Sequence, residues 1–243
     1  RHGDCYVNDA FGAAHRAHAS TTQLATFFPN DKMPGLLMQA EIQNARKVLM
    51  EAQKPFTAIV GGAKVSDKVL IVENLLNIAD HIIIGGGMAY TFFKAKGGRI
   101  GASLCEEDRI QKCIEILDRA SSMGVQIHLP MDSIVADQFA ADAQTDTSKS
   151  DEIPATWMGL DIGPEAIASF SEVIKQSKTI LWNGPMGVFE MKAFEQGTKS
   201  MAFAVAEATK NGAFSLIGGG DSAAAVQLFG LSSEVSYVST GGG

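Results

Sequence analysis

The sequence predicts an α/β fold, with a doubly wound, Rossmann-like and mostly parallel sheet flanked by helices. Short apolar runs recur along the chain and alternate with segments of helical periodicity. Most of these runs are continuously apolar rather than alternating, which is typical of parallel strands covered on both faces. Glycine turns follow five of these runs, where the strands are expected to end.

The expected strands are, in chain order, CYVND (5–9), TAIVG (57–61), HIIIG (81–85), QIHLP (126–130), TILWN (179–183), FSLIG (214–218) and VSYVS (235–239). Helical periodicity predicts helices over 34–52, 68–79, 106–124 and 199–212. Gly124 and Gly212 stand where helix C-caps are expected. The stretch 141–166 is polar, then punctuated by proline and glycine, and is too long for a simple connection. We expect it to be a surface excursion that returns to the sheet edge.

The composition is that of a soluble globular protein with enough apolar material for a sizeable core, since 46% of the 243 residues are hydrophobic and 19% are charged. The net charge of −7 and the lack of any dense Lys/Arg run argue against nucleic acid or an anionic membrane as the main partner. A small anionic substrate remains open, because local charge can oppose the global sign.

The three cysteines, Cys5, Cys105 and Cys113, are widely spaced and indicate neither a disulfide framework nor a zinc site, which fits a reducing cytosol. No apolar run approaches the roughly 20 residues of a membrane span, and the start carries no signal-peptide pattern. The chain begins without methionine and ends on a glycine turn, so we expect both ends to be cut.

The glycines cluster after five of the expected strands, at 61–62, 85–87, 184 and 187, 218–220 and 241–243. Because the carboxyl ends of parallel strands meet at one edge, we expect these turns to line a single ligand-binding crevice. Glycine lets the backbone approach a ligand, and the amides of a following helix attract anions. A phosphorylated ligand is therefore predicted. The alternative is that each turn only needs positive φ or tight helix packing.

Charged and polar side chains beside these turns point to the same chemistry. Lys64 is expected to start a helix, with Lys68 four residues on and on the same face, where two ammonium groups reach one polyphosphate. Asp221 suits a Mg²⁺ ligand that bridges phosphate oxygens, and Ser222 can donate to a phosphate. Solvated surface for the lysines, and a helix N-cap or first-turn acid for Asp221, remain the alternatives.

Other motifs are weaker. No P-loop sequence is present, and GGGDSA is a poor dinucleotide fingerprint, because Glu234 precedes the next strand instead of closing it. His15 and His18 in HRAH are spaced as a metal pair but have no third ligand nearby, so an anion patch or packing is preferred.

Taken together, these stretches resemble phosphoglycerate kinases. The matching segments are YVNDAFGAAHRAHAS (6–20), GGAKVSDK (61–68), IIIGGGMAYTF (82–92), WMGLDIGPE (157–165), ILWNGPMGVFE (180–190), IGGGDSAAAV (217–226) and STGGG (239–243). They stand in family order and cover essentially the whole chain. The resemblance implies a remnant of the N-terminal substrate lobe at 1–33, an interdomain helix at 34–53 and a nucleotide-binding lobe at 54–243.

The same resemblance assigns roles to individual residues. It implies that Arg16 belongs to the basic patch that holds phosphoglycerate, that Glu190 accepts from the ribose hydroxyls and that Asp221 holds Mg²⁺. Catalytic roles are implied for Lys64, Lys68, Gly220 and Gly243. Of these, Gly243 belongs to the final turn, 241–243, whose amides are expected to face the transferred phosphoryl group. The implied nucleotide site comprises Gly62, Ala63, Lys64, Lys68, Gly86, Gly87, Leu104, Asn183, Pro185, Val188, Glu190, Gly219, Gly220, Asp221 and Ser222.

The implied activity is Mg²⁺-dependent phosphoryl transfer between 1,3-bisphosphoglycerate and ADP, giving 3-phosphoglycerate and ATP, in a cytoplasmic monomer that binds neither nucleic acid nor membrane. Ser222 stands where the family commonly has threonine, and the segments with most substrate contacts of the N-terminal lobe are absent. The chain is therefore expected to bind nucleotide but to turn over weakly or not at all. The alternatives are a nucleotide-binding domain without catalysis and an NAD-dependent oxidoreductase.

Overall fold

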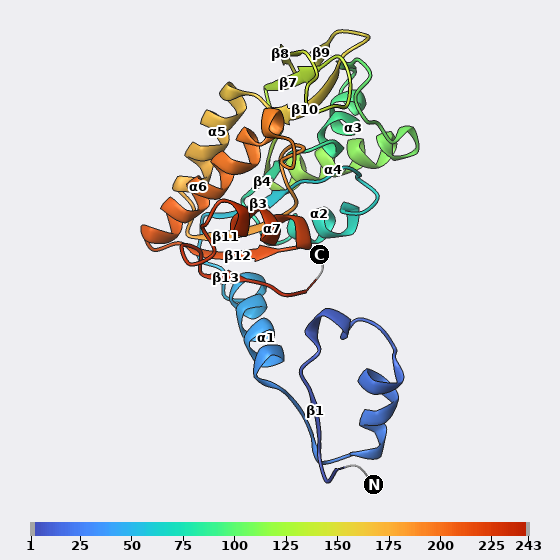
Figure 1. Cartoon of the computed structure of the whole chain (residues 1–243), viewed down its shortest axis with the longest axis vertical. Helices are drawn as coiled ribbons and strands as arrows, with labels where there is room; N and C mark the ends of the chain where they lie inside the picture. Colours follow the sequence, from blue (N-terminus) through green and yellow to red (C-terminus); the bar gives the residue numbers. More distant parts are fainter. Residues whose placement is uncertain (1–2, 242–243) are drawn as a thin grey trace.

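The structure, a computed structural model, describes residues 3–241 and consists of a large α/β body and a smaller N-terminal segment joined to it by one long helix (Figure 1). The strands are β1 Tyr6–Asn8, β2 Lys32–Pro34, β3 Phe56–Val60, β4 His81–Ile84, β5 Arg99–Ile100, β6 Gln126–His128, β7 Asp132–Ala136, β8 Thr145–Lys149, β9 Glu152–Ile153, β10 Met158–Ile162, β11 Thr179–Asn183, β12 Phe214–Gly218 and β13 Tyr237–Val238. The α-helices are α1 Leu36–Leu49, α2 Val69–Leu75, α3 Met88–Ala95, α4 Ile110–Met123, α5 Pro164–Lys175, α6 Gln196–Lys210 and α7 Gly220–Leu228.

Six strands form the central sheet in the order β13-β12-β11-β3-β4-β6, and every pairing in it is parallel. When the six strands of this sheet are numbered in chain order, their arrangement is that of a doubly wound Rossmann fold. The strand order reverses between β3 and β11. The expected fold class and all seven expected strands are confirmed, although β1 pairs with β2 outside the central sheet.

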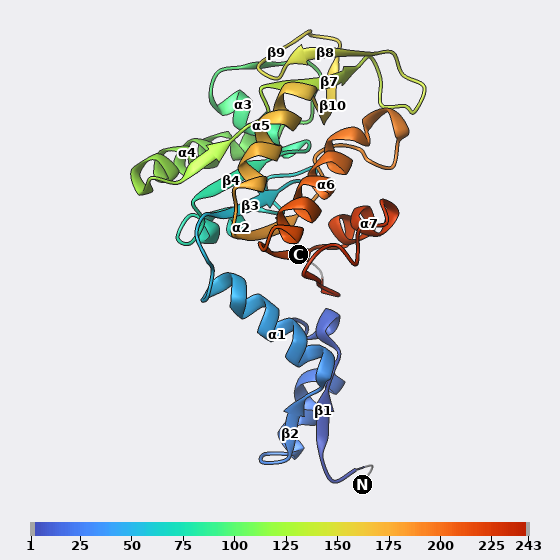
Figure 2. The same cartoon turned by 90° about the vertical axis from the view of Figure 1, so that its left-hand side faces the viewer.

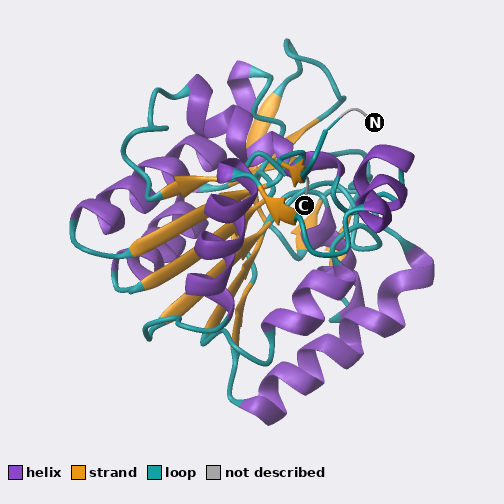
Figure 3. Cartoon of the chain, turned by 90° about the horizontal axis from the view of Figure 1, so that it is seen from below, coloured by secondary structure: helices purple, strands orange, loops and turns teal. Residues whose placement is uncertain are grey.

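Helices cover both faces of the sheet, as Figure 3 shows from below. On β3, Ala58 and Val60 pack in one apolar cluster with α2, α3 and α4, while Ile59 packs in the other with α5, α6 and α7. β3 is thus buried on both sides, which explains why its sequence is almost continuously apolar. The largest fully buried side chain, Trp182 on β11, lies in the second cluster and donates its indole N–H to the Gly184 carbonyl at 2.8 Å.

The four expected helices are present with shifted ends. Gly124 ends α4 with a left-handed φ of 72°, as a C-cap glycine should, and Gly212 takes a φ of 95° just beyond α6. The helix expected over 68–79 is shorter, because α2 gives way to turns after Leu75.

The stretch 141–166 departs from expectation. Instead of returning to the edge of the central sheet, it contributes β8 and β10 to a separate antiparallel sheet of order β10-β7-β8. The sequence signal was weak because β8 is polar and largely exposed, so it shows no apolar run. This small sheet stands at the end of the body far from α1 (Figures 1 and 2).

The N-terminal segment pairs β1 with β2 in parallel at the far end of α1 (Figure 2). Here Asp9 accepts the backbone N–H of Met38 at 2.8 Å, close to the start of α1. At the body, α1 packs against β11 and β12, and the ammonium of Lys47 lies 5.0 Å from the ring centre of Phe214. Among residues 3–241, no helix combines the length and the apolar character needed to cross a bilayer.

Candidate active site

The glycine turns meet at one edge of the central sheet, as the sequence predicts. All six strands are parallel, so the segments after β3, β4, β11, β12 and β13 leave from the same side. The segments after β3 and β11 flank the point where the strand order reverses, which is where ligands bind in open α/β sheets.

Several of these glycines are required by contacts between the turns themselves. A Cβ on Gly61 would lie 2.0 Å from the Pro185 carbonyl oxygen, and one on Gly184, whose φ is +103°, would lie 2.1 Å from that of Gly61. Gly86, with φ of +69°, would meet the Gly62 carbonyl oxygen at 2.5 Å. Packing between loops therefore explains these three positions without any ligand.

Gly220 differs, because a Cβ there would meet nothing within 4 Å. It opens α7, and the preceding Gly219 takes a φ of +85°. A helix N-terminus that faces open space leaves its first amide groups available to an anion. At this turn the structure favours the functional explanation for glycine.

A cavity of about 450 Å³ lies among these turns. Nine of the predicted nucleotide-site residues line it: Gly62, Ala63, Gly86, Gly87, Leu104, Pro185, Val188, Glu190 and Asp221. Gly187, from the predicted glycine turn after β11, also lines it, and the lining residues that sequence reasoning missed are Ala102, Phe139, Met158, Gly159 and Leu160. The lining is mostly apolar with two carboxylates, as in a site that holds a flat apolar ring and a few oriented polar groups.

The missed residues come largely from the small antiparallel sheet and its loops. Met158, Gly159 and Leu160 belong to β10, and Phe139 lies in the loop before β8 with 59% of its surface exposed. No local signal in this polar stretch identifies Phe139. Its place in the cavity depends on the packing of the second sheet over the edge of the first.

Lys64 and Lys68 lie in a turn, not on one face of a helix as expected. The backbone N–H groups of Lys68 and Val69 both donate to the Val65 carbonyl, and α2 begins only at Val69. Lys68 donates to Asn183 Oδ1 at the end of β11, and its Cε lies 3.9 Å from the position a Gly62 Cβ would take. The turn therefore brings Lys68 close to the lining residue Gly62, although Lys68 does not itself line the cavity, and the exposed Lys64 follows the lining residue Ala63.

Asp221 lies in the first turn of α7 and lines the cavity, so it is a first-turn acid and a wall residue at once. The adjacent Ser222 is completely buried, and its hydroxyl oxygen accepts the Gly184 N–H at 2.6 Å. This differs from the expectation that Ser222 faces a phosphate. Its hydroxyl instead joins α7 to the loop after β11, because the helix turns that side chain inward.

A buried carboxylate on α1 organises the last turn. Glu41 is only 2% exposed and accepts three hydrogen bonds, from the Ser239 hydroxyl at 2.8 Å, the Thr240 N–H at 2.7 Å and the Thr240 hydroxyl at 2.8 Å. Beside them the ring of Phe11 lies 2.4 Å from the position of a Gly241 Cβ. Helix α1, the turn after β13 and the N-terminal segment therefore meet at one place.

A second buried carboxylate, Asp161 on β10, lies behind the cavity. It accepts the backbone N–H of Gly197 at 2.6 Å and that of Ile162 at 2.9 Å, and it fills the space where Gly187 lacks a side chain. Burial raises the pKa of Asp161 to about 7, against the lowering effect of these two hydrogen bonds. Asp161 links the lining strand β10 to the start of α6.

Several predicted site residues are absent from the cavity lining: Lys64, Lys68, Asn183, Gly219, Gly220, Ser222 and Arg16. Arg16 is exposed in the N-terminal segment, where its Nε donates to His15 Nε2 at 3.2 Å. Gly243 lies outside the described residues, so its predicted role in the final turn is untested. Within residues 3–241, no three or more His, Cys, Asp or Glu side chains gather as a metal cluster, His15 and His18 included.

A second cavity of similar volume, about 450 Å³, is lined by Phe93, Lys96, His128, Asp151 and Phe170 among others. None of the glycine turns contributes to its lining, and its two charged side chains, Lys96 and Asp151, are exposed. We therefore take the cavity at the glycine turns as the candidate active site.

This chain is similar to known proteins in both sequence and structure. The chain is 56% identical over 241 residues to a phosphoglycerate kinase of Porphyromonas gingivalis, covering 99% of this chain and 58% of that protein. The phosphoglycerate kinase of Coxiella burnetii superposes with a TM-score of 0.92 at 43% identity, over 98% of this chain and 61% of that one. That of Pyrococcus horikoshii gives 0.82 at 31% identity, over 97% and 58%.

The chain thus spans about three fifths of the length of these relatives. The phosphoglycerate kinase family model matches residues 1–243. With the Rossmann strand order, the cavity at its reversal point and this match over the full sequence, the chain belongs to the phosphoglycerate kinase family.

Proposed function

We propose that this chain supplies the nucleotide side of a kinase that transfers a phosphoryl group reversibly between 1,3-bisphosphoglycerate and ADP, yielding 3-phosphoglycerate and ATP in glycolysis. The observation that carries the proposal is the cavity at the reversal point of the sheet. It brings Gly62, Gly87, Glu190 and Asp221 together, and the side chain of Lys68 lies close to Gly62.

The proposed division of the chain follows from the arrangement around α1. Residues 1–33 would belong to the substrate lobe, 34–53 to the interdomain helix, and 54–243 to the nucleotide lobe. In support, α1 contacts β11 and β12 at one end and the β1–β2 pair at the other. Arg16, in the first of these parts, would contribute to holding phosphoglycerate.

The lining suggests how a nucleotide would lie. Leu104, Val188 and the neighbouring glycines offer an apolar slot for adenine, and Glu190 offers a carboxylate to the ribose hydroxyls. The phosphates would then extend toward Gly219 and Gly220 at the start of α7, where free helix amides favour negative charge. Lys68, held by Asn183, would pair with these phosphates, and Lys64 would add a second ammonium group.

The donor chemistry fits Mg²⁺. This ion usually takes one or two protein carboxylates and completes its shell with phosphate oxygens and water. Asp221 places one carboxylate on the cavity wall, and it makes no ion pair among the described residues. When bound, the ion would neutralise part of the phosphate charge.

In this mechanism the chain positions groups and neutralises charge. In-line phosphoryl transfer needs little covalent help, and the carboxylate of 3-phosphoglycerate is already a competent nucleophile, so no general base is required. Lys64, Lys68 and the amides at Gly220 would stabilise charge on the moving group, together with the turn that ends at Gly243. Closure of the two lobes would exclude water that otherwise hydrolyses the acyl phosphate.

The proposed partners are small molecules only, an adenine nucleotide and phosphoglycerate, bound by a cytoplasmic monomer that binds neither nucleic acid nor membrane. The net charge of −7 supports the absence of a polyanionic partner. The alternative is an α/β domain that binds nucleotide without turnover. Its support is that the cavity is built entirely from residues 62–221, within the proposed nucleotide lobe.

Isothermal titration calorimetry with Mg-ADP tests the proposal. Lys68→Ala should weaken binding by about 1–3 kcal/mol, because a charged hydrogen bond to phosphate is lost. Lys210→Ala, which changes an exposed lysine at the end of α6, is the matched control and should leave the affinity unchanged. NAD should bind negligibly. Equal affinity for NAD and Mg-ADP, or no binding of either, would contradict the proposal. A coupled enzyme assay with phosphoglycerate then distinguishes a kinase from a domain that only binds nucleotide.

A further inference from the structure

The carboxylate of Glu106 clasps the turn between the two lysines. Its Oε2 accepts the Ser66 backbone N–H at 3.0 Å, and its Oε1 accepts the Ser66 hydroxyl at 2.6 Å. Ser66 stands midway between Lys64 and Lys68. One half-buried side chain therefore binds both polar groups of the central residue of the turn.

Glu106 is itself fixed to the cavity wall. Its backbone N–H donates to Thr91 Oγ1 at 3.2 Å, and Thr91 is buried on α3, the helix that follows Gly86 and Gly87. Two residues before Glu106, Leu104 lines the cavity. The clasp thus joins the lysine turn to the same segments that would hold the adenosine.

The charge of Glu106 has the wrong sign to attract a nucleotide. A carboxylate close to a phosphate site repels the ligand and offsets the positive potential of the lysines. Partial burial favours the neutral acid, but hydrogen bonds from Ser66 and the nearby ammonium of Lys64 together lower the pKa of Glu106 below its ordinary value. The group is therefore ionised at neutral pH, and its benefit must come from ordering the turn.

We propose that Glu106 is a positioning residue that holds the Lys64–Lys68 turn in the conformation that binds the nucleotide phosphates. This inference rests on the proposed function of the cavity. Apart from the clasp, the side chains of the turn are constrained by the burial of Val65 and by the hydrogen bond from Lys68 to Asn183, while Lys64 and Asp67 are exposed. Loss of the carboxylate should then cost phosphate affinity while the adenosine slot stays intact.

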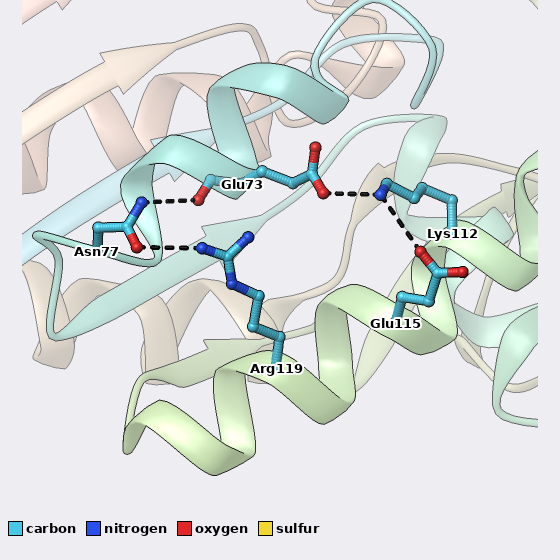
Figure 4. A network of polar contacts seen from close by, with 5 residues as sticks. All are labelled: Glu73, Asn77, Lys112, Glu115 and Arg119. Atoms are coloured by element: carbon cyan, nitrogen blue, oxygen red, sulfur yellow. Dashed lines mark hydrogen bonds and ion pairs between the residues drawn. The ribbon is translucent and has the colours of Figure 1, made fainter.

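A nearby connection between α2 and α4 provides a control. Away from the lysine turn, Lys112 on α4 bridges Glu73 on α2 at 2.7 Å and Glu115 at 3.2 Å, and Arg119 donates to Asn77 Oδ1 at 3.1 Å (Figure 4). Lys112→Met breaks the link from α4 to Glu73 without touching Ser66. It separates general loosening of α2 from loss of the clasp.

The experiment compares two ligands, Mg-ADP and adenosine, by calorimetry on the full chain. Glu106→Gln should weaken Mg-ADP binding roughly tenfold, the effect of a lost charged hydrogen bond, and change adenosine affinity less than about twofold. Electrostatics alone predicts the opposite sign, because the variant removes a negative charge from the phosphate site. Glu107→Gln, an exposed neighbour with the same charge change, and Lys112→Met should leave both affinities within about twofold.

Tighter or unchanged Mg-ADP binding in Glu106→Gln would overturn the inference, as would equal losses for Mg-ADP and adenosine. Ser66→Ala removes only the hydroxyl's bond and should give a smaller loss in the same direction, so it serves as the test if Glu106→Gln does not fold. Failure of the unmodified chain to bind Mg-ADP would instead refute the proposed function. Titration of the unmodified chain with Mg-ADP therefore distinguishes failure of the proposed function from failure of the role of Glu106.

Discussion

The three hydrogen bonds that Glu41 accepts should make it one of the more costly residues to remove from α1. Hydrogen bonds to a charged group contribute roughly 1.5–3 kcal/mol each when buried. Thr240 is exposed and Ser239 half-exposed, so water can replace part of the loss. We therefore expect Glu41→Ala to lower the free energy of unfolding by about 3 kcal/mol, well below the sum of the three bonds.

Glu41→Gln should cost less, about 1 kcal/mol, because the amide oxygen can still accept from Thr240 while the charge is lost. A second readout comes from Tyr237. Burial, and then the Glu41 carboxylate, raise the pKa of that phenol, so Glu41→Gln should lower it in a spectroscopic titration.

Urea unfolding of the three proteins measures these differences, provided the transition slopes agree. Glu51→Gln is the control, because it breaks only an exposed ion pair with Arg46, at 2.9 Å, and should change stability by no more than about 0.5 kcal/mol. If Glu41→Ala cost no more than this control, the contact between α1 and the turn after β13 would not hold the two together, and the reasoning would be refuted.

Three further predictions concern the body of the fold. Burial raises the pKa of Asp161 from 3.8 to about 7, so the folded state favours its protonated form. The free energy of unfolding should therefore fall by up to about 4 kcal/mol as pH rises from about 4 to 7. Asp161→Asn should lack this pH dependence in unfolding curves, and an unchanged dependence would contradict the assignment. Burial and then His81, whose Nδ1 lies 3.1 Å from His128 Nε2, lower the pKa of His128 below 6.5. The free energy of unfolding should therefore fall as pH drops below that value. His128→Gln should reduce this pH dependence, and a dependence identical to that of the unmodified protein would contradict the prediction. Gly184→Ala should lower the free energy of unfolding by more than about 3 kcal/mol in thermal or urea unfolding. The alanine would have to adopt a φ of +103° and would place its Cβ 2.1 Å from the Gly61 carbonyl oxygen. A near-neutral result would show that the two loops do not approach so closely.

The central sheet could be predicted because its signals are local and its consequences follow from topology. Each continuously apolar run is one strand, and parallel strands place their carboxyl ends on one edge, so five glycine turns had to meet. The same rule explains why Glu190 and Asp221 share a cavity although neither is near the other in sequence.

What the sequence did not reveal is set by packing between distant segments. Glu41 and Thr240 lie 199 residues apart, and nothing in the pattern of α1 marks Glu41 as buried. Lys64 and Lys68 have helical spacing, but the Val65 carbonyl closes a turn there and the helix starts later. Ser222 follows a phosphate-type turn, yet the loop after β11 competes for its hydroxyl.

The reversal of strand order between β3 and β11 also affects how the site comes into being. These neighbouring strands are separated along the chain by more than a hundred residues, and the cavity draws its walls both from the segment between them and from the segments that follow β11. A cut between β6 and β7 would leave part of the lining on each fragment, so ligand binding reports that the segments after β3, β4, β11 and β12 have come together. A chain cut between β6 and β7 should accordingly behave as two fragments whose association strengthens as nucleotide is added, because a ligand that recognises only the joined state drives the pieces together.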